Sequence, residues 1–359
     1  MIKPPDYIAA IQPYVPGKPI EELERELGIA NSIKLASNEN PLGPSPEALK
    51  TIRDSFSDLN RYPDGAGYYL KSTLSQMLSI SPDELVLGNG SNELLDLVAR
   101  TYLQAGDEAV MASPSFVVYG IAVQSVGARP IQVPLKEHRH DLEAMAAAIT
   151  PKTKMLFIAN PNNPTGTINT KDEFDRLMGK VTDNMLVVVD EAYYEYVSAP
   201  DYADSMKHFR AGRNILILRT FSKIYGLAGL RIGYGIAKKE ILTDMNRLRE
   251  PFNTNSIAQM AALAALKDKA HVTNSRKING EGKEYLYQQL TSLGISYVPT
   301  EANFIYIPIT DSIAVNNSLM KKGVIIRPMG PKAIRVTIGL PEENRRFIEA
   351  LKEVISVSA

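Results

Sequence analysis

The stretch MLVVVDEAY, residues 185–193, and the stretch NILILRTFSK, residues 214–223, decide the class of fold. Each is a continuous apolar run that ends in polar, chemically active side chains. Such runs, when helical patterns separate them, are typical of strands that are buried on both faces of a parallel α/β sheet. Ligands bind such sheets at the carboxyl ends of the strands, so a site is expected where these runs end.

Further apolar runs lie on both sides of this pair. They occupy residues 84–87, 108–111, 130–133, 155–158 and 230–236, with helical patterns at 91–103 and 171–179. Later in the chain, helical patterns occupy residues 257–266, 281–293 and 342–357, and strand patterns occupy 303–307, 323–327 and 333–338. We therefore predict an α/β chain with a large domain over residues 46–250, and a smaller α+β domain that residues 251–359 form with an N-terminal segment, residues 1–45.

The composition argues against several kinds of function. Lys plus Arg and Asp plus Glu both number 40, so the formal net charge is +0 and a nucleic-acid partner is not expected. There is no Cys, and we interpret the turn that holds His138 and His140 as solvated rather than as a metal site. Neither a membrane span nor the apolar core of a signal peptide is present, so we expect a cytoplasmic protein without a membrane partner.

Two of the motifs at strand ends can bind anions or polar oxygens. The turn GNGSNE, residues 88–93, leads from a strand into a helix and can offer backbone N–H groups to a phosphate. It is not a dinucleotide fingerprint, because Glu93 stands where the third glycine would be. The turn NPNNPTG, residues 160–166, can point the amide of Asn163 at a ligand oxygen. Taken singly, both turns could simply reverse the chain.

Two further motifs supply an acid and an amine. Asp190 ends the most apolar strand, where a partly desolvated carboxylate needs a cationic partner. Lys223 ends the next strand between hydroxyl residues and a glycine-rich stretch, and a lysine that is shielded from water can form a Schiff base. Taken singly, these could be a solvated acid and a surface lysine. Together, the four motifs match the phosphate, phenolic oxygen, ring nitrogen and aldehyde of pyridoxal 5'-phosphate.

With these motifs the sequence resembles the fold-type I pyridoxal-phosphate aminotransferases, and among them the histidinol-phosphate aminotransferases. The general motifs are NPTG at 163–166, Asp190 with Tyr193, and Lys223 followed by GLRIG at 229–233. The motifs PYVPGK at 13–18, LASNENPLG at 35–43 and NRYPD at 60–64 resemble those of the histidinol-phosphate group, although some aromatic aminotransferases share them. The resemblance covers nearly the whole chain and implies a mostly parallel, seven-stranded sheet flanked by helices in the large domain.

The resemblance also implies a role for each cofactor residue. Lys223 would bind the cofactor covalently and move the substrate proton, and Asp190 would pair with the ring nitrogen. Asn163 and Tyr193 would hydrogen-bond the ring oxygen, and Phe116 would stack on the ring. The implied phosphate ligands are Ser91, Asn92, Thr220, Ser222, Arg231 and, from the neighbouring subunit, Tyr62. A homodimer is therefore implied.

On the substrate side, the resemblance places Arg335 at the strand position that binds a carboxylate. It implies that Arg327 and Arg335 bind the phosphate of histidinol phosphate, and that Arg335 also binds glutamate and 2-oxoglutarate. Tyr14 would close over the substrate. The alternative is that either arginine forms only an internal ion pair.

The implied activity is a ping-pong transamination between glutamate or 2-oxoglutarate and histidinol phosphate or imidazole acetol phosphate, in histidine biosynthesis. The alternatives are an aromatic amino-acid aminotransferase and a decarboxylase like those that act on threonine phosphate. A cofactor-sensing regulator is disfavoured, because no basic DNA-binding domain is appended to the cofactor fold.

Overall fold

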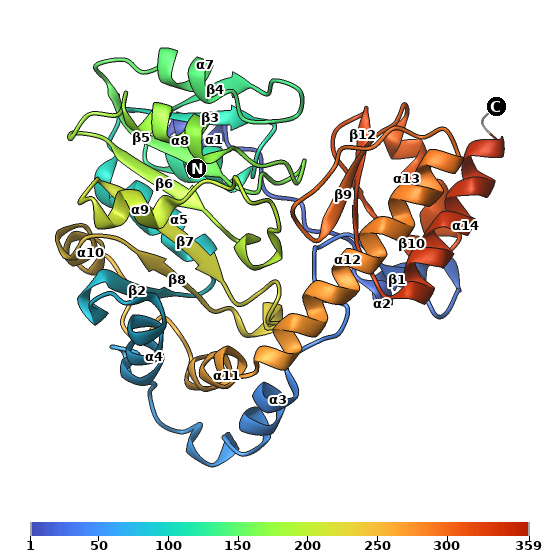
Figure 1. The fold of residues 1–359 in the computed structure, drawn as a ribbon, viewed down its shortest axis with the longest axis horizontal. Coiled ribbons are helices and arrows are strands. Elements are labelled where there is room, and N and C mark those ends of the chain that lie inside the picture. The colour runs from blue at the N-terminus through green and yellow to red at the C-terminus, as the bar shows by residue number, and fades with distance from the viewer. Residues whose placement is uncertain (1, 358–359) are drawn as a thin grey trace.

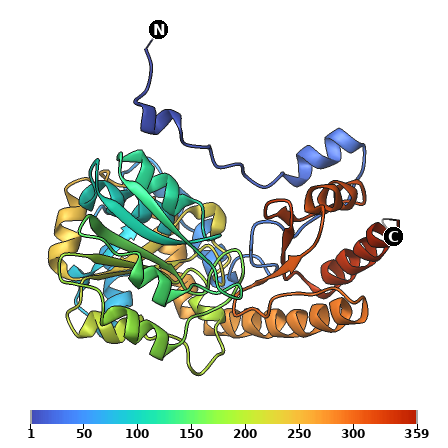
Figure 2. The same ribbon diagram turned by 90° about the horizontal axis from the view of Figure 1, so that it is seen from above.

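The computed structural model describes residues 2–357, so residue 1 and residues 358–359 of the predicted domains lie outside the described part of the chain. Figure 1 shows a large unit built on a broad sheet and a small unit beside it. The long helix α12 (Lys269–Ser292) runs from one unit to the other. From above, Figure 2 shows the N-terminal segment passing from the large unit across to the small one.

The sheet of the large unit has seven strands in the order β2-β8-β7-β6-β5-β3-β4. They are β2 (Leu85–Gly88), β3 (Glu108–Ser113), β4 (Arg129–Pro134), β5 (Thr153–Ala159), β6 (Leu186–Asp190), β7 (Ile215–Thr220) and β8 (Gly233–Ile236). The strands β7, β6, β5, β3 and β4 pair in parallel, and β8 runs antiparallel to both of its neighbours. The predicted mostly parallel sheet is therefore confirmed.

Both faces of this sheet are covered, which explains the unbroken apolar runs. In β6, Val187 and Val189 join the core on one face, and Leu186 and Val188 join the core on the other. The helices on the first face are α4 (Tyr68–Leu78), α7 (Leu142–Ala147), α8 (Lys171–Met178), α9 (Ser205–Arg210) and α11 (Ser256–Lys267). The helices on the second face are α5 (Ser91–Tyr102), α6 (Val118–Ser125) and α10 (Lys239–Asn246).

The small unit combines two short sheets with helices. Its antiparallel sheet has the order β11-β12-β9, and a parallel pair joins β1 to β10. The strands are β1 (Ile33–Lys34), β9 (Phe304–Pro308), β10 (Val324–Ile325), β11 (Arg327–Pro328) and β12 (Ala333–Thr337). The strand predicted at 323–327 is thus divided, because β10 pairs with the N-terminal segment and β11 pairs with β12. The helices are α2 (Ile20–Leu27), α13 (Ser312–Lys321) and α14 (Pro341–Val357), whereas α1 (Asp6–Ala9) lies against α6 and α3 (Pro46–Arg53) against α11.

The helix α12 begins twelve residues earlier than the sequence pattern indicated. Its first half buries His271, Ser275 and Asn279 between the units, so the helix has no apolar stripe there for the pattern to detect. The preceding helix α11 packs its buried alanines into the core of the large sheet. The division of the chain near residues 45 and 250 stays a prediction. The helix α11, which follows residue 250, packs against the large sheet.

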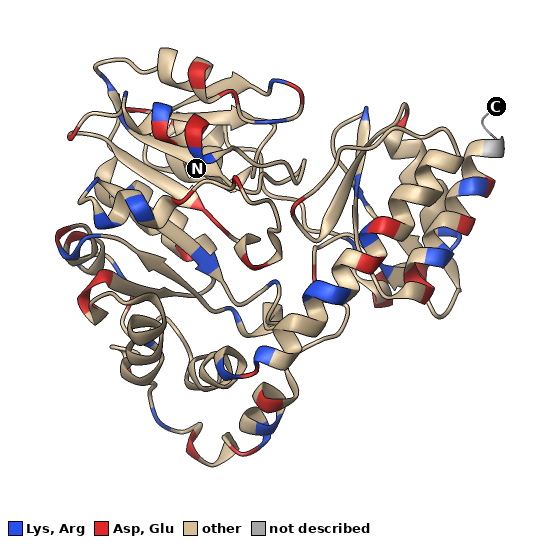
Figure 3. Cartoon of the chain, in the orientation of Figure 1, with Lys and Arg blue, Asp and Glu red and all other residues tan. Residues whose placement is uncertain are grey.

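Charges are spread over both units. Figure 3 shows Lys and Arg intermixed with Asp and Glu along the elements of each unit, in keeping with the equal totals in the sequence. Within residues 2–357, no helix combines the length and apolar character that a membrane crossing requires.

Candidate active site

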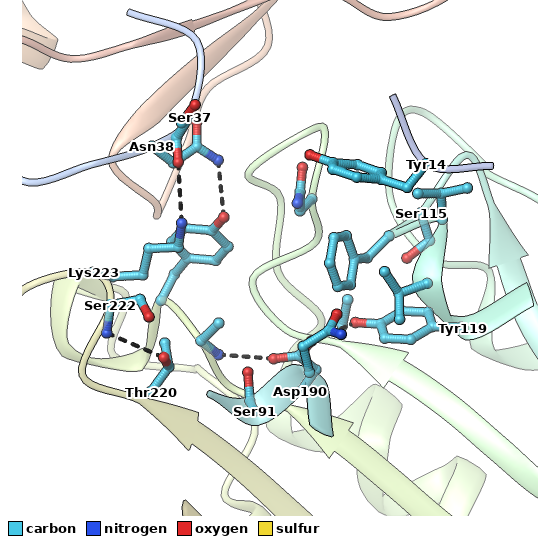
Figure 4. A pocket seen from close by; sticks show the side chains of 18 of the residues that line it. Tyr14, Ser37, Asn38, Ser91, Ser115, Tyr119, Asp190, Thr220, Ser222 and Lys223 are labelled. Atoms are coloured by element: carbon cyan, nitrogen blue, oxygen red, sulfur yellow. Dashed lines mark hydrogen bonds between the residues drawn. The ribbon is translucent and has the colours of Figure 1, made fainter. Parts of the chain in front are cut away.

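A cavity of about 620 Å³ opens where β5, β6 and β7 end, between the large and small units. Its lining includes the predicted residues Tyr14, Ser91, Asn92, Phe116, Asn163, Asp190, Tyr193, Thr220, Ser222, Lys223, Arg231, Arg327 and Arg335. Figure 4 shows Tyr14 across the cavity from Lys223 and Asp190. The structure thus brings together residues from both ends of the chain, as a single site requires.

Asp190 is the buried carboxylate at the end of β6. Its Oδ2 accepts a hydrogen bond from the Tyr119 hydroxyl at 2.7 Å, and its Oδ1 accepts one from the Ala192 backbone N–H at 3.1 Å. Burial raises the pKa of Asp190, while these two hydrogen bonds and the charge of Lys223 oppose that rise. An acid in this position is stabilised as an anion by a cationic ligand.

Lys223 lies on the same side of the cavity, just after β7. Its Nζ donates to the Ser37 carbonyl at 3.2 Å and lies 5.5 Å from the centre of the Tyr193 ring. Burial lowers the pKa of Lys223 to about 8, helped by the positive charges of Arg335 and Arg231. A lysine with this pKa has an appreciable neutral fraction near neutral pH, which is the nucleophilic form.

Two further polar side chains, those of Tyr193 and Asn163, line the cavity. The Tyr193 hydroxyl accepts a hydrogen bond from the Asn38 side-chain amide at 2.8 Å. Asn163 Oδ1 accepts one from Arg335 Nη1 at 2.5 Å. Because a guanidinium has only donors, the oxygen of Asn163 faces Arg335 and its Nδ2 remains available to a ligand oxygen.

The start of α5 forms a corner of the cavity whose chemistry suits an anion. The glycine before it, Gly90, has φ +74°, and a Cβ there would stand 2.6 Å from Arg231 Nη2. A Cβ on Gly233 would stand 2.6 Å from the backbone nitrogen of Ser91. Gly90 therefore lets the guanidinium of Arg231 approach the start of α5 closely, and Gly233 lets β8 do the same. Arg231 also donates to Ser222 Oγ at 3.3 Å, which holds that hydroxyl in the same corner.

The opposite wall carries two arginines on neighbouring strands. Arg327 in β11 and Arg335 in β12 are directly paired in the antiparallel register. Arg335 is buried, donates Nη2 to the Ala36 carbonyl at 2.7 Å, and has no partner for its Nε. Burial lowers the pKa of Arg335 below its usual value. Arg327 donates to the Val15 carbonyl at 2.6 Å, with its guanidinium 5.5 Å from the Tyr14 ring centre.

Neither arginine of this pair forms an ion pair with a carboxylate in residues 2–357. The alternative interpretation, in which Arg327 or Arg335 forms only an internal ion pair, therefore finds no such pair among residues 2–357. The positive charge of each guanidinium is therefore available to bind an anionic ligand, and burial of Arg335 strengthens such a bond.

The sequence analysis missed several residues of the site. Asn38 donates a hydrogen bond to Tyr193, and Tyr119 donates one to Asp190. The carbonyl of Ser37 accepts one from Lys223. Tyr119 follows Phe116 by three residues, a helical spacing that would have placed both on one face. The prediction that the turn of His138 and His140 is solvated was wrong for His140, which is buried. Its Nε2 lies 3.0 Å from Asn162 Oδ1, and burial lowers the pKa of His140 to about 4.

One predicted residue, Tyr62, is not part of this cavity. Its side chain is 82% exposed and stacks on Phe252, with the ring centres 4.7 Å apart. Because the contact was predicted for a neighbouring subunit, a single chain does not test it. No cluster of three or more potential metal ligands occurs within residues 2–357.

Comparisons with known proteins show the family to which this chain belongs. The model of the aminotransferase class I and II family matches residues 30–351. A histidinol-phosphate aminotransferase from Moorella thermoacetica is 54% identical over 97% of this chain and 92% of the relative. Histidinol-phosphate aminotransferase 2 from Hydrogenovibrio crunogenus is 48% identical over 98% of this chain and 96% of the relative. The solved structure of the histidinol-phosphate aminotransferase from Sinorhizobium meliloti, in complex with pyridoxal-5'-phosphate, matches with a TM-score of 0.91 at 28% identity, covering 98% of this chain and 97% of that one.

Proposed function

We propose that this chain, which belongs to the aminotransferase class I and II family, is a pyridoxal-phosphate-dependent histidinol-phosphate transaminase of histidine biosynthesis. One observation carries the proposal. A lysine of lowered pKa, a buried carboxylate and a glycine-lined anion corner share one cavity, with two arginines on the wall across from them. The amino group would pass between glutamate or 2-oxoglutarate and the imidazole substrate.

The residues of the cavity fit pyridoxal phosphate. The corner formed by Ser91 and Arg231, from which glycines exclude any Cβ, suits its phosphate. The further candidate ligands of the phosphate are Asn92, Thr220 and Ser222. The carboxylate of Asp190 suits its ring nitrogen, and Phe116 suits a ring face. When bound, the cofactor supplies a ring that withdraws electrons from the substrate carbon.

The chain's own groups then have distinct tasks. Lys223 Nζ, partly neutral near pH 8, attaches the cofactor and afterwards takes the proton from the substrate carbon and returns it. The Asp190 carboxylate keeps the ring nitrogen protonated through a charge-assisted hydrogen bond. The Tyr193 hydroxyl and the free Nδ2 of Asn163 orient the ring oxygen.

The two arginines distinguish the substrates. Arg335, already desolvated, can bind the carboxylate of glutamate or a phosphate, because its fork matches both anions. Arg327 stands beside it on β11 and adds a second positive charge, which a phosphate uses better than a carboxylate. Tyr14 covers this part of the cavity from the N-terminal segment.

The test is the half-reaction of the purified holoenzyme with single amine donors, followed by the absorbance of the cofactor. Histidinol phosphate is expected to convert the bound cofactor far faster than phenylalanine or tyrosine. Faster conversion by the aromatic amino acids would favour the aromatic aminotransferase, and release of carbon dioxide from threonine phosphate would favour the decarboxylase.

We also infer a homodimer, in which Tyr62 reaches the phosphate corner of the partner subunit. The inference is supported by exposed aromatic side chains near Tyr62 in the chain or in contact with it, namely Tyr68, Tyr69 and Phe252. An aromatic surface of this kind is typical of protein interfaces. Light scattering of the purified protein tests the assembly. The cytoplasmic location and the domain boundaries stay predictions.

A further inference from the structure

We propose that Tyr119 is a positioning residue, which keeps Asp190 ionised and oriented toward the ring nitrogen of the cofactor. The proposal rests on the proposed function, since it assigns a role within the same site. Tyr119 lies in the first turn of α6, and its side chain is 1% exposed. Its hydroxyl donates to Asp190 Oδ2 at 2.7 Å, across 71 positions of sequence.

The Tyr119 hydroxyl can act only as a donor to this carboxylate. Burial, and then the negative charge of Asp190, raise the pKa of the phenol well above its usual value. The phenol therefore stays protonated throughout the range in which enzymes work. A neutral donor fixed against one oxygen favours the charged form of an acid, and favours one orientation of its plane.

The ring of Tyr119 is held on two sides. It stacks on Phe157 of β5 with the centres 5.1 Å apart, and it meets Phe116 edge to face at 5.6 Å. Its backbone N–H also bonds the carbonyl of Phe116 at 3.1 Å. Tyr119 thereby joins the residue that faces the cofactor ring to the residue that meets the ring nitrogen.

The groups that face Asp190 show why this hydroxyl matters. Burial raises the pKa of Asp190, and the Tyr119 hydrogen bond is the strongest influence that lowers it. The other groups are the Ala192 N–H and Lys223, which lower the pKa, and Glu191, which raises it. Without the hydroxyl, Oδ2 would lose its hydrogen-bond donor, and the pKa of Asp190 would rise further.

The test is a pH titration of the visible absorbance of the holoenzyme. When the cofactor is bound, an ionised Asp190 would keep the ring nitrogen protonated, which would lower the pKa of the nitrogen that Lys223 contributes. Tyr119→Phe keeps the packed ring but removes the hydrogen bond that favours the ionised form of Asp190. The absorbance midpoint is therefore expected to rise by about 0.5–1 pH unit. A rise of this kind would not follow from a loss of packing alone.

The matched control is Tyr102→Phe. It removes a partly buried hydroxyl that donates to the Ile241 carbonyl at 3.2 Å, between α5 and α10 and outside the cavity lining. Its midpoint is expected to equal that of the unaltered protein. In an Asp190→Asn background there is no carboxylate whose ionised form the Tyr119 hydroxyl could favour. Adding Tyr119→Phe to that background is therefore expected to cause no further rise of the absorbance midpoint.

The outcomes separate this proposal from the proposed function. A midpoint of Tyr119→Phe that matches the unaltered protein, or an equal rise with and without Asp190, would overturn the role of Tyr119. If the unaltered protein bound no cofactor at Lys223, the proposed function itself would fail. Melting of each apoprotein shows whether the variants are folded before they are loaded.

Discussion

The two walls of the cavity are built in different ways. The cofactor wall (Ser91, Asp190, Thr220 and Lys223) comes from the ends of strands in one sheet and from the start of a helix that packs on that sheet. The substrate wall (Tyr14, Arg327 and Arg335) comes from the N-terminal segment and the small unit. Two of its hydrogen bonds, from Arg327 to Val15 and from Arg335 to Ala36, join residues about 300 positions apart, and a third joins Arg335 to Asn163 of the large unit.

This difference separates two kinds of requirement. Groups on one sheet keep fixed distances, because the strands are close-packed and buried on both faces. Groups on a segment and a second unit can be exchanged without disturbing that sheet. We therefore expect changes in the cofactor wall to lower turnover for every substrate, and a change of Arg327 in the substrate wall to alter the preference among substrates.

Lys223→Ala is the strongest test of the cofactor wall. It removes both the covalent attachment and the proton carrier, so turnover is expected to fall by on the order of 10⁴-fold or more. Borohydride reduction followed by peptide mapping measures the attachment. A reduced adduct on any other lysine would sink the assignment of Lys223.

Asp190→Asn is expected to have the next largest effect. The amide keeps the size of the side chain but not the charge that holds the ring nitrogen protonated, so turnover should fall by about 10²–10³-fold while the fold persists. The measurement is kcat with histidinol phosphate and with phenylalanine. Because the cofactor wall serves every substrate, a loss confined to one of them would break the comparison.

The arginines test the substrate wall. Arg327→Ala should lower kcat/KM for histidinol phosphate by about 10–150-fold, the effect of one charge-assisted hydrogen bond. The loss should be much smaller for phenylalanine, which has no phosphate. Arg335→Ala serves as the matched control, because its fork binds phosphate or carboxylate and both donors should suffer. Equal losses in Arg327→Ala would make the aromatic aminotransferase the better interpretation.

The lowered pKa of Lys223 predicts a pH dependence within the cofactor wall. Only the neutral amine attacks the aldehyde, so the rate at which apoprotein takes up pyridoxal phosphate should rise with pH and level off above the pKa of about 8. Between about pH 7 and about pH 9 the expected gain is about tenfold. A rate that still climbs near pH 10 would show an ordinary, solvated lysine.

Tyr62→Phe is expected to have the smallest effect. The loss of one hydroxyl from the inferred contact across the dimer should weaken cofactor binding by about two- to tenfold. Subunit exchange sharpens the test, since mixing this variant with Lys223→Ala should restore activity in one shared site. Unchanged cofactor affinity would argue that Tyr62 does not reach the partner's phosphate corner.

Much of the cofactor wall could be predicted because its chemistry lies in short, contiguous motifs. Asp190 and Lys223 directly follow apolar runs, and the sheet itself dictates that such residues meet at one edge. Tyr119 escaped prediction because its partner is 71 positions away and packing against Phe157 and Phe116 aims its hydroxyl. The first half of α12 escaped because its buried face is polar.

The sequence by itself determined the class of the sheet, its strand-end motifs and the family of the chain, because apolar periodicity and local motifs are properties of neighbouring residues. Only the tertiary structure decided which carbonyls and amides complete the site. The pairing of Ile33 with Val324 brings the N-terminal segment to the small unit, and it sets Ala36 and Asn38 beside Arg335 and Tyr193. These contacts come from the packing of segments that are 155 to 299 positions apart in the chain, which no local pattern records.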